Sequence, residues 1–212
     1  AGEVLGTFAI YAASVGEPSA AERDSLDLVA RTAALVIERD RAQSRERFLL
    51  AVDDAVRPLV EAEAITATAA RALGQHLQVQ RCAYATVEAD EDTFELTGNY
   101  TDGVAGIAGW YTFSQFGAEC VRAMREGRPY VVTDAEDDPR IGPDVVGAYR
   151  ATAIRAVICV PVLKSGRFVA AMAVHATWPR AWHADEVDVV QQVASRCWES
   201  IERARLTRTL HD

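Results

Sequence analysis

The sequence predicts an α+β fold, with an antiparallel sheet of about five to six strands and N- and C-terminal helices packed on one face. Three observations lead to this prediction. Short apolar runs separated by turn residues fill the middle of the chain. Long patterns with apolar residues at three- and four-residue steps flank these runs on both sides. The composition, 50% hydrophobic and 25% charged, is that of a globular protein that buries a core.

The first helical pattern is long. Ser19 followed by Glu22 has the form of a capping box, in which each side chain satisfies a backbone N–H at the helix start. Residues 38–47 are almost wholly polar but contain neither Gly nor Pro, and they connect two helical patterns. We therefore expect one continuous helix here, followed after Pro58 by a second helix over residues 62–76.

Strands follow the second helix. Residues 81–88 and 93–100 flank an acidic turn, as in a hairpin with a solvated tip. A second hairpin, formed by residues 156–163 and 167–176, is joined by Lys164-Ser-Gly166, where Gly permits a positive φ. The remaining expected elements are a helix at 119–125, a short strand at 128–133, a last helix at 183–209, a loop at 102–117, and a loop with one helical turn at 134–149.

An internal repeat suggests the domain organisation. Residues 4–42 resemble residues 168–206 at a constant offset of 164, and each copy reads as a strand, a loop and a long helix. The repeat predicts four segments, which are the C-terminal strand and helix of a truncated preceding domain at 1–40, a linker and N-terminal helix at 38–60, a complete domain at 48–206, and the start of an output linker at 207–212.

Charge and composition argue against several classes of partner. The formal charge of −9 and the pI near 5.0 do not suit a phosphate-binding surface, so no nucleic acid is expected. No apolar run approaches the ~20 residues of a membrane helix and no signal peptide opens the chain, so we expect a cytoplasmic protein without membrane contact. No metal site is expected either, because the acidic turn at 89–92 lacks calcium-loop spacing. The four cysteines lie far apart within apolar segments, which indicates buried thiols.

The second hairpin carries a family resemblance. Residues 154–175 read IRAVICVPVLKSGRFVAAMAVH, and WPRAW and a helix beginning Asp185-Glu-Val follow. This stretch resembles a GAF domain, and residues 133–140 look like the loop that precedes the hairpin in that family. Tandem modules joined by Arg/Glu-rich helices look most like the sensory region of bacterial two-component sensor histidine kinases. The resemblance implies a pocket for an unknown small molecule on the sheet face away from the terminal helices, coupled through helical linkers to an output domain.

The resemblance also bears on the ligand. The Asn-Lys-x-Phe-Asp-Glu signature of cyclic-nucleotide-binding members is absent, so a cyclic nucleotide is not expected. The places of the Cys-His pair that attaches a bilin hold Asp144 and Val145, so no covalent bilin is expected. His175 falls where phytochrome-type members keep a pocket histidine, although a packed core histidine is the competing interpretation. The candidate pocket residues are Trp110, Phe113, Tyr130, Asp134, Arg140, Tyr149, Arg155 and His175.

Two other functions stay open. The domain could be a ligand-free dimerisation or spacer module, or a thiol-dependent enzyme like the methionine sulfoxide reductases that share the fold. We expect no catalytic residue in this segment and place any kinase active site elsewhere in a longer parent chain, although Leu-His211-Asp faintly resembles a phosphoacceptor box. A homodimer through the terminal helices is expected from the apolar stripe that begins at Leu26, Val29, Ala33 and Val36, although the same stripe could be core.

Overall fold

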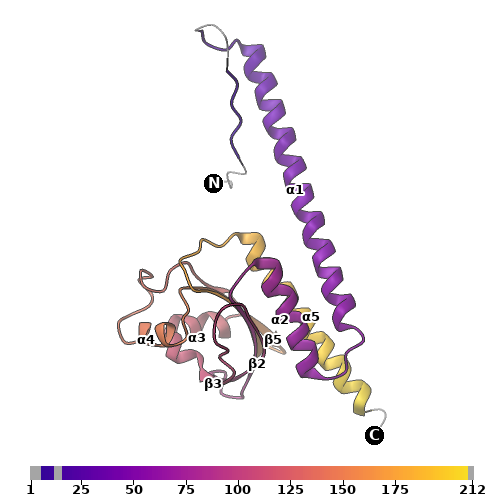
Figure 1. The fold of residues 1–212 in the computed structure, drawn as a ribbon, viewed down its shortest axis with the longest axis vertical. Coiled ribbons are helices and arrows are strands. Elements are labelled where there is room, and N and C mark those ends of the chain that lie inside the picture. The colour runs from indigo at the N-terminus through magenta and orange to yellow at the C-terminus, as the bar shows by residue number, and fades with distance from the viewer. Residues whose placement is uncertain (1–5, 12–15, 210–212) are drawn as a thin grey trace. The chain divides into compact units, whose positions relative to one another are not determined.

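The computed structural model describes residues 6–11 and 16–209 and divides into two compact units, with the boundary between Phe48 and Leu49. The first unit consists mainly of α1 (Ala20–Val56), whose last turns belong to the second unit. The helix is continuous through the polar segment, as the sequence predicts (Figure 1). The predicted capping box is also confirmed, because the Glu22 carboxylate accepts from the Ser19 N–H at 2.7 Å and the Glu22 N–H donates to Ser19 Oγ at 3.3 Å.

Residues 6–11 correct one expectation. They lie in the first copy of the repeat, at the place where that copy is expected to begin with a strand, but they form no strand and pair with no other segment that the structure describes. A strand needs a hydrogen-bonding partner, and the strands of the second unit are paired among themselves. Residues 1–5 and 12–15 lie outside the described residues. That residues 1–40 end a preceding domain stays a prediction.

The second unit is built on a six-stranded sheet with the order β3-β2-β1-β6-β5-β4, in which every pair is antiparallel. This confirms the predicted fold class. The strands are β1 (Arg81–Val87), β2 (Thr93–Thr101), β3 (Gly109–Thr112), β4 (Tyr130–Val132), β5 (Ala156–Lys164) and β6 (Arg167–Ala176). Ser165 and Gly166, both with positive φ, close the β5–β6 hairpin as expected. β3 is an additional edge strand inside the segment predicted as loop.

Two helices cover one face of the sheet. These are α2 (Ala62–Leu77) and α5 (Ala184–Thr209), which lie beside one another in Figure 1. The prediction that N- and C-terminal helices share a face is confirmed. A close approach fixes α2, because a Cβ on Gly74 would lie 2.1 Å from a ring carbon of Tyr100 on β2. Val52, from the later part of the predicted apolar stripe, is core in this unit at the end of α1.

The opposite face of the sheet carries short elements and loops (Figure 1). They are the 3-10 helix η1 (Phe113–Phe116), α3 (Ala118–Arg125) and α4 (Val146–Ala151). A second set of buried side chains fills the space between these elements and the sheet, and it includes Phe94, Phe113 and Phe168. Among the helices that the structure describes, none is both long and apolar enough to cross a membrane.

Candidate functional site

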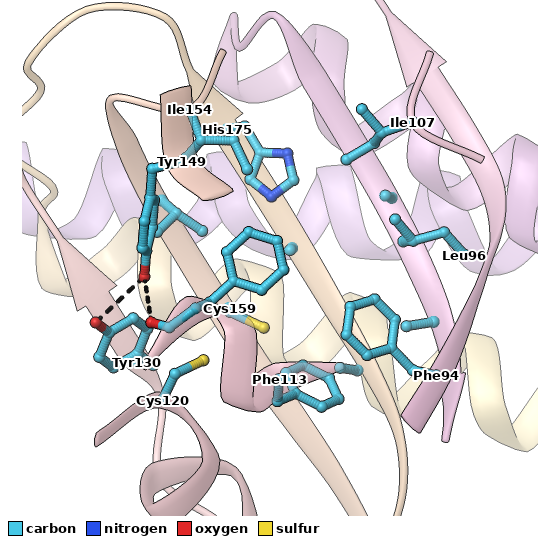
Figure 2. A pocket seen from close by; sticks show the side chains of 16 residues that line it. Phe94, Leu96, Ile107, Phe113, Cys120, Tyr130, Tyr149, Ile154, Cys159 and His175 are labelled. Atoms are coloured by element: carbon cyan, nitrogen blue, oxygen red, sulfur yellow. Dashed lines mark hydrogen bonds between the residues drawn. The ribbon is translucent and has the colours of Figure 1, made fainter. Parts of the chain in front are cut away.

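A cavity lies within the layer between the sheet and the loops (Figure 2). It leaves about 60 Å³ open to the centre of a water-sized sphere. Small residues make room above the central strands, with Ala83 and Ala85 on β1 and Ala171 and Ala173 on β6. Strand alternation places these pairs on the same face. The other lining residues are Phe94, Leu96, Ile107, Phe113, Phe116, Cys120, Tyr130, Tyr149, Ile154, Val157, Cys159 and His175.

Aromatic rings form one side of the cavity. The ring centroid of Phe113 lies 4.2 Å from that of Phe94 and 5.1 Å from that of Phe168. Phe116 meets Tyr149 edge-on, with 5.4 Å between centroids. Phe113 and Phe116 belong to η1. A hydrogen bond of 2.8 Å from the Ser114 N–H to the Asp92 carboxylate anchors the start of this helix. The loop therefore presents apolar aromatic area to the cavity.

Two tyrosine hydroxyls supply part of the little polarity in the wall. The Tyr149 hydroxyl donates to the carbonyl of Phe116 at 2.9 Å and shares a 3.3 Å hydrogen bond with the Tyr130 hydroxyl (Figure 2). Burial raises the pKa of Tyr130 to about 12 and raises that of Tyr149 further. Both phenols are therefore neutral at physiological pH and tie α4 and β4 together beside the cavity.

His175 enters the cavity from the end of β6 (Figure 2). Its side chain is buried, with 6% exposed, and Nδ1 has no hydrogen-bond partner. Burial lowers the pKa of His175 to about 3, and the nearby charge of Arg81 lowers it as well. The imidazole is therefore neutral, with one nitrogen that donates and one that accepts.

The cysteines in the wall show no sign of activation. Cys120 and Cys159 are buried, and Cys159 Sγ lies 3.7 Å from Met124 Sδ. Burial raises the pKa of Cys159 to about 12 and raises that of Cys120 well above its ordinary value. A reactive thiol needs an exposed, electropositive setting that favours the thiolate. These positions offer the opposite, so they favour a packing role for both sulfurs.

Four of the predicted pocket residues, Phe113, Tyr130, Tyr149 and His175, are brought together in the cavity wall. Trp110 is not, and its side chain is 59% exposed. The strand register explains the difference. Trp110 pairs with Glu95, whereas its neighbour Tyr111 pairs with the cavity-lining Phe94. Successive side chains of a strand point to opposite faces. The Trp110 side chain therefore points away from the cavity, toward the face of the sheet that α2 and α5 cover.

Asp134, Arg140 and Arg155 also lie outside the cavity wall. Arg155 donates to both carboxylate oxygens of Asp134, at 2.8 and 2.6 Å. Arg140 makes a similar pair with Asp138, and its guanidinium lies 4.9 Å from the ring centroid of Tyr130. In each pair the guanidinium and the carboxylate satisfy one another's hydrogen bonds. The pairing lowers the pKa of the Asp134 and Asp138 carboxyl groups. These three candidate residues are thus held in two ion pairs and do not form part of the cavity wall.

Sequence reasoning missed the alanine floor of the cavity and the buried Arg81. A signal for the alanines was present, because small residues recur at period two on β1 and again on β6. Among the residues that the structure describes, no group of three or more His, Cys, Asp or Glu side chains could hold a metal ion. The site is therefore an apolar cavity with a few neutral polar groups. Such a site suits the binding of a small molecule.

Several solved structures share this fold. The free methionine-R-sulfoxide reductase of Neisseria meningitidis has a TM-score of 0.62 and 16% identity, covering 77% of this chain and 91% of its own. The phycoerythrobilin-bound GAF domain of a cyanobacterial phytochrome has a TM-score of 0.66 and 11% identity, covering 77% and 97%. A methyl-accepting chemotaxis protein, residues 122 to 287, has a TM-score of 0.60 and 15% identity, covering 74% and 98%. These likenesses concern the fold alone.

Among curated proteins, none matches this sequence. The family model of the GAF domain matches residues 61–201, which contain the whole sheet, α2 and most of α5. The chain therefore belongs to the GAF domain family.

Proposed function

We propose that this chain is the sensory part of a bacterial sensor histidine kinase, in which a small molecule in the cavity changes the packing of the terminal helices and so biases an output domain. The names of similar structures, a bilin-bound phytochrome domain and a chemotaxis protein, support a sensory role. The observation that carries the proposal is that the cavity and the terminal helices lie on opposite faces of the same strands.

The central strands are the physical link. On β1, Ala83 and Ala85 line the cavity, whereas Cys82 and Tyr84 alternate with them toward the helices. Tyr84 lines a groove together with Ile201 of α5, and burial and the proximity of Cys197 raise the pKa of its hydroxyl. A ligand that displaces β1 on the cavity side therefore moves Tyr84, which shares a groove with α5.

Coupling requires more than occupancy. A ligand shifts the equilibrium between two helix arrangements only if it binds them with different affinity. Side chains packed on both faces of a strand supply such a difference, because close-packed layers cannot deform on one side alone.

We propose that α5 is the output element, and that two copies pair through the terminal helices. Val29 and Val36 of α1 are 46% and 62% exposed, which supports pairing along that stripe.

The cavity bounds the ligand. About 60 Å³ is far below the roughly 300–1,000 Å³ of pockets for drug-sized ligands. A ligand that fits without rearrangement therefore has few non-hydrogen atoms, and the apolar wall favours a hydrocarbon portion.

Native mass spectrometry of the protein purified from its own cells tests the proposal. We expect a retained small molecule that is released on denaturation. Ala173→Leu fills the cavity and should prevent retention. Ala67→Leu, the same substitution at an exposed position of α2, should leave retention unchanged. A bare protein mass in every sample would support the alternative, a ligand-free spacer.

A further inference from the structure

Unsatisfied polar atoms gather at one end of the cavity face. Among the described residues, the side-chain N and O atoms that are buried without a hydrogen-bond partner belong to Arg81, Tyr84, Asn99 and His175. All of these residues except Tyr84 share the cavity face. Arg81 is the cross-strand partner of His175, and Asn99 is the partner of the cavity-lining Ala83. Buried polar groups in native proteins almost always have partners, so this concentration needs an explanation.

Arg81 is a buried cation without a carboxylate. Its side chain is 2% exposed, and its guanidinium donates to the carbonyls of Thr152 and Ala105, both at 2.9 Å. Its Nε–H has no partner, and no ion pair of the described residues includes Arg81. Two neutral carbonyls leave a full positive charge uncompensated, which is unfavourable in a buried position. Burial accordingly lowers the pKa of Arg81.

The position of Arg81 ties this charge to the cavity. Arg81 donates to the carbonyl of Ala105, two residues before Ile107, and to that of Thr152, two residues before Ile154. Both isoleucines line the cavity. Its strand partner His175 also lines the cavity, close to Ile154 in Figure 2. Arg81 is not itself one of the residues that line the cavity, but it lies directly beside the wall at the end where the imidazole projects. The opposite end is walled by Phe94 and Phe113 and is apolar (Figure 2).

The apolar cavity and the cation beside its wall together make an amphipathic site. An occupant that satisfies both ends needs a hydrocarbon portion among the rings and an anionic acceptor toward Arg81 and His175. A carboxylate accepts hydrogen bonds from an arginine N–H and from a neutral imidazole at the same time, and charge-assisted bonds of this kind are stronger than neutral ones.

We propose that the cavity binds a small monocarboxylate, whose carboxylate accepts from the Nε–H of Arg81 and from His175 and whose hydrocarbon tail lies on the alanine floor. This inference rests on the proposed function of the same cavity. The cavity is small, with about 60 Å³ open to the centres of water-sized spheres, so a short-chain acid is the size class that we propose.

Titration of the whole chain with propionate and propionamide tests the inference, with thermal unfolding and calorimetry as readouts. The two compounds have the same shape, but only propionate is charged. We expect propionate to bind at least about tenfold more tightly than propionamide, because it makes charge-assisted hydrogen bonds. Sodium chloride at equal ionic strength should not reproduce the effect. This comparison uses the unmodified protein, so it does not depend on the folding of a variant.

Arg81→Met should abolish the preference for propionate while the variant still binds propionamide. Equal binding of the two compounds by the unmodified protein would overturn the inference. So would an equal effect of chloride, which would indicate an unspecific anion site. A failure of both compounds to bind would also overturn the inference. The proposed function is judged separately, because native mass spectrometry detects a retained molecule of any chemistry.

Discussion

Lowering the pH should destabilise the second unit through His175. Its folded-state pKa is lowered to about 3 by burial and by the charge of Arg81, whereas an unfolded histidine titrates near 6.5. Above about pH 6.5 neither state binds the proton, and the contribution of the neutral imidazole to stability is fully present. Below that pH only the unfolded state binds it, so this stability is lost as the pH falls toward 3. The loss is about 1.4 kcal/mol per pH unit, or about 2 kcal/mol between pH 7 and pH 5.

Urea unfolding of the wild type and of His175→Gln at several pH values measures this contribution. The glutamine variant cannot titrate, so its free energy of unfolding should fall less steeply between pH 7 and pH 5, by about 2 kcal/mol. His76 also has a lowered pKa, but it is present in both proteins and cancels in the comparison. Carboxylate buffers should be avoided because they would occupy the proposed site. Parallel pH profiles for the two proteins would refute the reasoning.

Three further predictions concern other parts of the chain. Cys159 should react with a thiol reagent in the native protein at least about a hundredfold more slowly than in urea, since burial raises its pKa to about 12; fast native labelling would revive the enzyme alternative. Val29→Glu with Val36→Glu should convert a dimer to a monomer in analytical ultracentrifugation, and an unchanged mass would exclude pairing along this stripe. Gly74→Ala should destabilise the fold by about 1–3 kcal/mol in thermal unfolding, because its Cβ would overlap the Tyr100 ring; an unchanged Tm would show that the ring relaxes freely.

Much of the fold could be predicted from the sequence, because the local sequence patterns indicate the same strands and turns that the sheet contains. The β5–β6 hairpin is an example, since apolar strands flank a two-residue turn in which Ser165 and Gly166 both have positive φ. The short strand β3 could not be predicted. It has four residues, begins with Gly109, and pairs with β2 alone among the strands that the structure describes.

The candidate site was harder to predict, because strand register decides which side chains enter the cavity. Trp110 and Tyr111 are adjacent aromatic residues, and only the pairing of Tyr111 with Phe94 determines which of them faces the cavity side. Arg81 gave no signal in the sequence, since its acceptors are carbonyls 24 and 71 residues away. Arg155 is a candidate by its place in the sequence alone, and only the fold shows that Asp134 is its ion-pair partner.

The sequence prediction of a phosphoacceptor resemblance falls at the end of the chain. His211, which resembles part of a phosphoacceptor box, lies outside the described residues. α5 ends at Thr209. The kinase context stays a proposal that rests on the resemblance.

Hydrogen exchange of α5 tests the central claim most directly, namely that occupancy of the cavity changes the packing of the output helix. The measurement compares protein purified with its retained molecule and the same protein after that molecule is removed. We predict altered amide protection in α5 and in β1, whose Tyr84 faces that helix. Altered protection around the cavity with identical protection in α5 would contradict the account, because the ligand would then bind without any effect on the output helix.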